Sequence, residues 1–217
     1  MTSTAEDDEP DVAARGHASQ AGYDLGRLFA FSDGVFAIAI TLLVLTIPVP
    51  NVAKAAQLPG QLVGVAPSLA GFALSFWLVG TLWIAHHRLL RQLNFCDGTI
   101  LWLNLLLLMG VCLVPFASSL LARYGGGPAG VIPYAALQAA VGVVFLSLRL
   151  YLMRRGVDMR DTLQLSWLPV VTFVLSIPLA LGNVNFAYVA WLVGFAISRA
   201  GAGTVMPRLL GRLRRRR

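Results

Sequence analysis

The chain has 217 residues, of which 57% are hydrophobic and only 12% are charged, and its mean hydropathy is +0.73. A soluble domain carries about 25% charged residues, so the composition excludes an ordinary soluble domain and predicts an all-α polytopic membrane protein. The formal net charge is +7, with sixteen Arg and one Lys. Heavy use of Arg, Ala, Gly and Leu is typical of a GC-rich bacterial genome.

Residues 1–22 are acidic, rich in Ala and Ser, and have no apolar core. They therefore predict a disordered cytoplasmic tail and not a signal peptide. A single domain of six transmembrane helices is expected over residues 23–206, because a spanning helix needs about 20 apolar residues. The six apolar stretches are approximately Leu28–Pro48, Leu62–Ala85, Thr99–Leu121, Val131–Met153, Leu163–Leu181 and Phe186–Val205. Residues 207–217 form a basic tail, also expected to be cytoplasmic.

The basic residues divide unequally between the two sides of this topology. The odd-numbered connections hold only Lys54 and Arg123, whereas the other fifteen Arg lie on the even-numbered connections, the helix ends beside them and the two tails. Positive residues stay cytoplasmic, so both termini are expected inside a multi-pass protein of the cell inner (plasma) membrane. The Arg-rich terminus is expected to orient the protein in the membrane and to contact anionic lipid head groups. A nucleic-acid role is not expected for it.

The first apolar stretch begins with a base, a hydroxyl and an acid, which are Arg27, Ser32 and Asp33. Ionisable groups near a bilayer core are costly, so they indicate function by default, although helix capping by Ser32 and Asp33 is an equal alternative. Above them a stripe recurs at helical spacing. Its members are Gly34, Ile38, Thr41, Leu42 and Leu45. On periodicity alone, lipid contact or packing inside the bundle explains the stripe best.

Polar residues of the second and third stretches fall in the same cytoplasmic half. Trp83 suits the aromatic belt at the membrane interface, and His86, three residues later, is placed to bond inward. Asn104 lies inside the third stretch, where a buried Asn usually bonds across helices. A polar cluster tying the first three helices together follows as a hypothesis. The adjacent His86 and His87 point about 100° apart on a helix, so no metal site is expected.

Signs of catalysis or coupled transport are weak. The chain has no Gly-x-Ser-x-Gly, His-Glu-x-x-His or P-loop motif, and Glu is absent after residue 9. The outer half of the predicted membrane region holds no carboxylate or histidine for a coupled pump, which favours passive conduction. The Gly-rich run at Tyr124–Pro128 lacks the order of a carbonyl selectivity filter, so we expect a turn there and no re-entrant filter loop.

These residues give the chain a resemblance to the transmembrane protein 175 family of potassium channels, in its single-repeat prokaryotic form. The family signature Arg-x-x-x-Phe-Ser-Asp is matched by Arg27, Phe31, Ser32 and Asp33. Trp83 and His86 match a Trp-x-x-His pattern. Leu103-Asn104-Leu105 with Pro115-Phe116 matches a third pattern. Order and spacing agree over residues 27–119.

The resemblance implies six helices per chain and a homotetramer in which the first helix lines the pore. It further implies a hydrophobic constriction at Ile38, with Leu42 and Leu45 nearby and the Thr41 hydroxyl between apolar layers. The resemblance implies that monovalent cations permeate the pore and that potassium is preferred. It implies no cofactor and no enzymatic step. Hydrophobic constrictions can gate by dewetting. Phe31, Ser32 and Asp33, with His86 and Asn104 as neighbours, would hold the first helix in register.

The favoured interpretation is therefore a potassium-preferring cation channel that conducts passively. The main alternative is a small, dimeric secondary transporter that uses Asp33 and His86 as a proton-linked site. A structural or assembly protein of the membrane, with no conducting path, is the second alternative.

Overall fold

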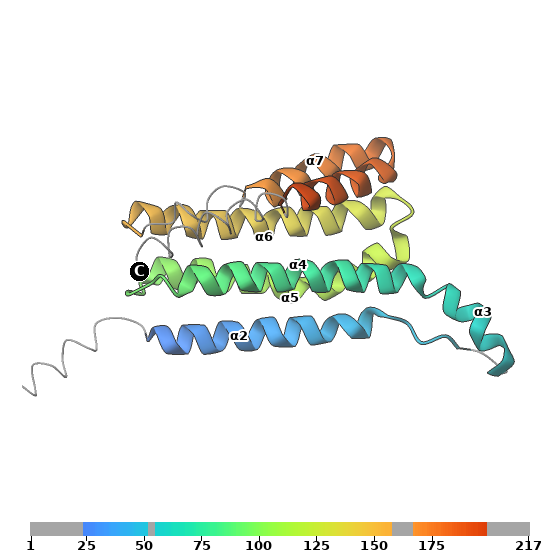
Figure 1. The fold of residues 1–217 in the computed structure, drawn as a ribbon, viewed down its shortest axis with the longest axis horizontal. Coiled ribbons are helices and arrows are strands. Elements are labelled where there is room, and N and C mark those ends of the chain that lie inside the picture. The colour runs from blue at the N-terminus through green and yellow to red at the C-terminus, as the bar shows by residue number, and fades with distance from the viewer. Residues whose placement is uncertain (1–23, 52–54, 158–166, 199–217) are drawn as a thin grey trace, which may run out of the picture.

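The computed structural model describes residues 24–51, 55–157 and 167–198, and this part of the chain is helical with no strand. Four long helices lie side by side, followed by two shorter ones (Figure 1). The long helices are α2 (Leu25–Leu42, continued by the 3₁₀ turn η1, Leu43–Thr46), α4 (Ala66–Leu90), α5 (Gly98–Tyr124) and α6 (Pro128–Arg154). The shorter elements are η2 (Ala55–Gln57), α3 (Leu58–Val63), α7 (Leu168–Gly182) and a helix at Val184–Ser198.

The first four predicted spans are present as helices long and apolar enough to cross a membrane. The last two are shorter within the described residues: α7 has 15 residues, which is about 22 Å of rise against a hydrocarbon core of about 30 Å. Their predicted ranges, Leu163–Leu181 and Phe186–Val205, extend into residues 158–166 and 199–217. Those segments, like both predicted tails, lie outside the described residues.

The connection after α2 differs from the sequence prediction. Residues 49–61 separate the first two predicted spans, and η2 and the start of α3 form inside this connection. Pro59 lies in the first turn of α3, where proline is compatible with a helix start. The second span was expected from Leu62, yet α4 begins only at Ala66, with Pro67 in its first turn. The helix is interrupted at Gly64, so the predicted boundary was wrong by about one turn.

Side-chain caps fix the starts of two long helices. Asp24 accepts a hydrogen bond of 2.8 Å from the Gly26 amide at the start of α2. Asp97 accepts one of 3.0 Å from the Ile100 amide at the start of α5. Short acidic side chains satisfy the free N–H groups of a first turn and interact well with the helix dipole.

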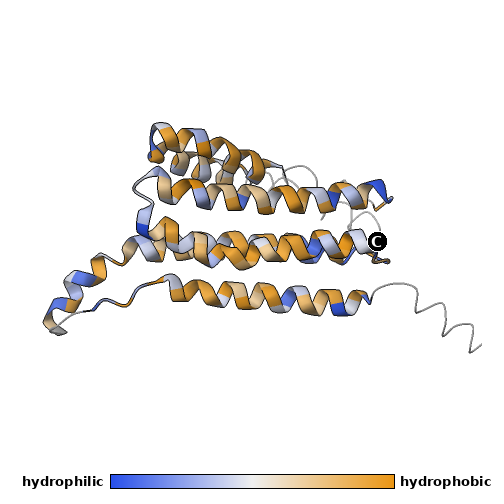
Figure 2. Cartoon of the chain, turned by 180° about the vertical axis from the view of Figure 1, so that it is seen from behind, coloured by the Kyte–Doolittle hydropathy of each residue, from blue (hydrophilic) through white to orange (hydrophobic). Residues whose placement is uncertain are grey.

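The helices form layers, with α2 on one side, α4 and α5 in the middle, then α6, then α7 (Figure 1). Successive long helices run in opposite directions, so the starts of α2 and α5 and the ends of α4 and α6 share one end of the molecule. We call it the basic end, because it carries Arg27, Arg88, Arg91, Arg154 and Arg155. Apolar residues cover the lengths of the long helices, and hydrophilic residues gather near their ends (Figure 2).

The central helix is α5, which packs against α2, α4 and α6. Small residues allow close approach: a Cβ added at Gly110 would lie 2.6 Å from Val141 Cγ2 of α6, and one at Gly142 would lie 2.7 Å from Val170 Cγ2 of α7. Lipid tails are as apolar as leucine, so helices in membranes associate through this kind of tight packing and through hydrogen bonds.

Candidate functional site

The helix α2 has two different faces. The face toward α4 and α5 carries residues that recur every three or four positions and are buried, namely Leu28, Ser32, Phe36, Ala39 and Leu43. The opposite face carries the stripe picked out from the sequence. Ile38 is 61% exposed and Leu45 is 76% exposed, while Thr41 and Leu42 are also exposed. Within the described part of the chain, α2 is therefore anchored by one face, and the opposite face with Ile38, Thr41, Leu42 and Leu45 (the Ile38 stripe) stays exposed.

The anchoring face of α2 is joined to α4 and α5 by a buried hydrogen-bond chain. Asn104 Nδ2 donates to Ser32 Oγ at 3.0 Å, and Asn104 Oδ1 lies 2.7 Å from His86 Nε2. Because the amide oxygen only accepts, His86 must carry its proton on Nε2. All three side chains are almost completely buried. Three helices are thus held at one depth by two bonds that are closed to solvent.

A second contact joins the same helices nearer the surface. Trp83 Nε1 donates to Asp33 Oδ1 at 2.8 Å, so the carboxylate of α2 faces α4. The His86 ring also packs against Phe36, with ring centroids 5.3 Å apart. Arg27 and Phe31 are exposed and take no part in this network. Among the described residues no acid pairs with Arg27.

The exposed stripe of α2 offers one hydroxyl among apolar side chains. Thr41 Oγ1 donates to the Ile38 carbonyl of its own helix at 2.8 Å. The hydroxyl proton is therefore turned inward, and the oxygen lone pairs are left for a ligand on the exposed side. A cation could use such an oxygen, whereas Ile38 and Leu45 present only hydrocarbon. Across the described ranges, His, Cys, Asp and Glu form no group of three able to hold a metal ion.

A second buried polar network lies between α4, α5 and α6 and was not predicted from the sequence. Gln138 Nε2 donates to Tyr134 Oη at 3.1 Å, and Tyr134 Oη lies 3.1 Å from Ser75 Oγ. Ser75 donates to Ser118 at 3.0 Å, and Ser118 donates to the Gly71 carbonyl at 3.3 Å. Single serines in apolar helices do not stand out, so only the packing shows their shared role.

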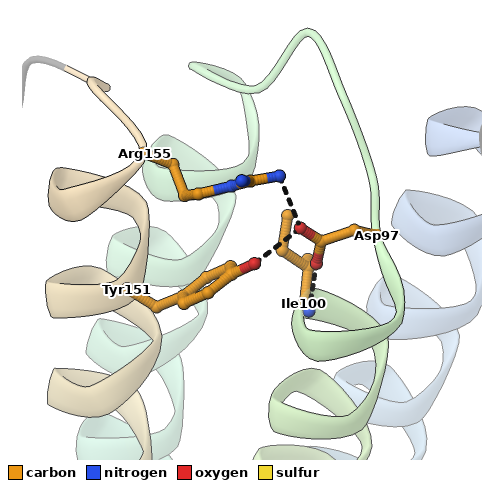
Figure 3. Close-up of polar contacts among 4 residues, drawn as sticks. All are labelled: Asp97, Ile100, Tyr151 and Arg155. Atoms are coloured by element: carbon orange, nitrogen blue, oxygen red, sulfur yellow. Dashed lines mark hydrogen bonds and ion pairs between the residues drawn. The ribbon is translucent and has the colours of Figure 1, made fainter.

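A third polar group lies at the basic end, between the start of α5 and the end of α6 (Figure 3). Tyr151 donates to Asp97 Oδ2 at 2.6 Å, and Arg155 Nη2 lies 3.3 Å from the same oxygen. Burial works against the charge of Asp97. Hydrogen bonds from Tyr151 and the Ile100 amide, with the charge of Arg155, outweigh that effect and hold the pKa of this carboxyl below its usual range.

Apolar helices of membrane-spanning length, joined near one end by buried polar side chains, define an integral membrane protein. The family described as "Endosomal/lysosomal potassium channel TMEM175" matches residues 27–115, which hold the α2 stripe and the Ser32–Asn104–His86 chain. The protein belongs to this family, and the resemblance drawn from its sequence is confirmed.

Similar proteins agree on this membership. A potassium channel of Streptomyces collinus is 38% identical over 135 residues, which cover 60% of this chain and 66% of the relative. One from Chamaesiphon minutus is 41% identical over 127 residues, covering 56% and 63%. The chain thus spans slightly less than two thirds of these relatives. A crystal structure described as a lysosomal potassium-selective channel TMEM175 homolog from Chamaesiphon minutus superposes with a TM-score of 0.71 at 32% identity, covering 81% of this chain and 97% of that one.

Proposed function

We propose that this chain is one subunit of a potassium-preferring cation channel that conducts passively through a homotetrameric pore. The observation that carries the proposal is the pair of faces on α2. The helix is fixed by Ser32 and its buried neighbours, while the Ile38 stripe on the other face is free to meet identical stripes from other subunits. Similarity to chains named as potassium channels supports potassium as the permeant ion.

In this proposal Ile38 forms the constriction, and Leu42 and Leu45 extend the apolar lining. A narrow ring of such side chains excludes water and blocks ions, and a wider ring fills with water and lets ions pass. The ring can therefore act as a gate as well as a selectivity element. Thr41 supplies a hydroxyl oxygen between the apolar layers, and its inward-turned proton leaves that oxygen able to replace water around potassium. The Asp33–Trp83 and Ser32–Asn104 bonds hold the lining helix in rotation and height.

The proposed topology has six membrane helices over residues 23–206, no re-entrant filter loop, and both tails in the cytoplasm of a bacterial cell. The basic end then faces the cytoplasm, where anionic lipid meets its arginines. No cofactor is required. The proton-linked transporter is less favoured because Asp33 bonds to Trp83 and His86 bonds to Asn104, with no hydrogen bond between Asp33 and His86.

Electrical recording from purified protein in planar bilayers separates these functions. A channel gives unitary currents whose reversal potential follows the potassium gradient and is indifferent to a pH gradient. A reversal potential that moves with pH, from a dimeric protein, would indicate the transporter. Four subunits by native mass measurement are expected. A protein that produces no potassium current and no flux would instead be structural.

A further inference from the structure

A polar cavity of about 370 Å³ opens at the basic end, outside the network that holds α2. It is lined by the turn that follows α4 and by the end of α6, through Gln92, Asn94, Phe95, Arg155, Gly156 and Val157. The helices α4 and α6 are both long enough to span a membrane and both end beside it. The cavity therefore lies at the depth where a bilayer presents its phosphate head groups.

The guanidinium of Arg155 lies over two aromatic rings. Its Cζ lies 5.4 Å from the centroid of Phe95 and 5.9 Å from that of Tyr151. Its ion pair with Asp97 uses Nη2 alone, at 3.3 Å, which is long beside the 2.7–2.9 Å typical of a charged N–H···O bond. Asp97 is already engaged at shorter distances by Tyr151 and the Ile100 amide. Among the described residues, most of the five planar donors of Arg155 are therefore left for another partner.

The rest of the lining supplies donors of the same kind. Gln92 and Asn94 are exposed and line the cavity, and the side-chain amide of each carries two N–H donors. The exposed Arg91 directly follows the last residue of α4, and among the described residues Asp97 is the one acid that pairs with Arg155. A planar guanidinium fork with added amide donors matches the oxygens of a phosphate group, which it can bind through two parallel bonds.

We propose that this cavity binds a phosphate group through Arg155, Asn94 and Gln92. The phosphate belongs to an anionic phospholipid head group or to a soluble phosphate compound. In either case the ligand bridges the turn after α4 to the end of α6. The proposal is independent of ion conduction, because it concerns binding at the surface of one subunit.

Binding can be measured on the purified full chain in detergent by isothermal titration, with dioctanoyl phosphatidic acid and inorganic phosphate as probes. Dioctanoylglycerol, which has the same acyl chains and no phosphate, is the ligand control. We expect saturable binding of phosphatidic acid and none of dioctanoylglycerol. If inorganic phosphate also binds at the cavity, the site takes soluble phosphate. If it does not, the site belongs to a lipid head group.

Three variants test whether phosphate binds at this cavity. Arg155→Ala should weaken binding by at least about tenfold, because a charged, two-bond contact is lost. Arg154→Ala removes the same charge from the next residue, which does not line the cavity, and should change affinity by less than about twofold. Asn94→Ala should weaken binding by about three- to tenfold with no loss of the ion pair.

Asp97→Asn separates a binding role from a structural one. If Arg155 matters only through its ion pair, Asp97→Asn and Arg155→Ala will act alike. If Arg155 binds phosphate, removal of the neighbouring carboxylate leaves affinity unchanged or raises it, while Asn still caps α5. Absence of saturable binding, equal loss in Arg154→Ala and Arg155→Ala, or loss in Asp97→Asn would each overturn the proposal.

Discussion

The hydrogen bond between Ser32 and Asn104 should contribute measurable stability, and a double-mutant cycle can isolate it. The perturbations are Ser32→Ala, Asn104→Leu and the two together. Asn104 is fully buried and bonds to both Ser32 and His86, so Asn104→Leu leaves two buried polar groups without a partner. Interhelical bonds in membranes average about 0.6 kcal/mol and reach about 1.7 kcal/mol.

From those values we expect Asn104→Leu to cost about 1–3 kcal/mol of unfolding free energy, since it breaks two bonds in a water-free site. The coupling between Ser32 and Asn104 should be about 0.6–1.7 kcal/mol, because the cycle cancels all but their direct interaction. Tryptophan fluorescence can follow unfolding of the purified protein as SDS is added to mixed micelles. Both single variants and the double variant should be compared at the same protein-to-detergent ratio.

Ser119 provides the matched control on α5. Its hydroxyl donates to the Phe116 carbonyl of the same helix at 2.7 Å, and the residue does not touch Asn104 by any hydrogen bond. A cycle of Ser119→Ala with Asn104→Leu should therefore give a coupling near zero. The reasoning is refuted if the Ser32–Asn104 coupling equals that of the Ser119–Asn104 pair.

Three further predictions concern other parts of the molecule. The pKa of Asp97 is lowered in the folded protein, so its ionised form stabilises the fold above the unfolded pKa of about 4, and this stabilisation is lost as the pH falls through the lower folded pKa. Thermal unfolding measured between pH 2 and 7 should therefore show a loss of stability at acid pH that the Asp97→Asn variant lacks. Gly110→Ala should cost about 1–3 kcal/mol through contact with Val141, whereas Gly80→Ala, with open space around its Cβ, should be neutral or stabilising in the same unfolding assay. Thr41→Val should lower the potassium-to-sodium permeability ratio measured by reversal potentials, and Thr41→Ser, which keeps the hydroxyl, should retain it; an unchanged ratio in Thr41→Val would remove the hydroxyl from the permeation path.

The four long helices could be predicted from the sequence because each apolar run exceeds the thickness of a membrane. Their boundaries could not be placed as well. Pro67 is compatible with both a kink inside a helix and a first turn, and only the structure shows that α4 begins there. The α3 helix was missed because its six residues have no buried face that could produce a periodic pattern.

The polar cluster near the start of α2 could be predicted in part from the sequence. Topology alone places Ser32, His86 and Asn104 at one depth, and their polarity in apolar helices suggests mutual contact. The rotation of each helix is set by packing and cannot be read from depth. For that reason the pairing of Trp83 with Asp33, and the contact of Asp97 with Tyr151 and Arg155 across more than fifty residues, required the structure.

The central claim, that the Ile38 stripe lines the path of potassium, can be tested most directly by potassium flux from liposomes that contain the purified protein. Ile38→Asn makes an apolar constriction wettable, so we expect faster flux and weaker potassium-over-sodium preference than in the unaltered protein. Leu175→Asn is the matched control, because Leu175 on α7 is 55% exposed and lies on another helix. Its flux should equal that of the unaltered protein. Equal flux and equal selectivity from Ile38→Asn, Leu175→Asn and the unaltered protein would contradict a pore at Ile38.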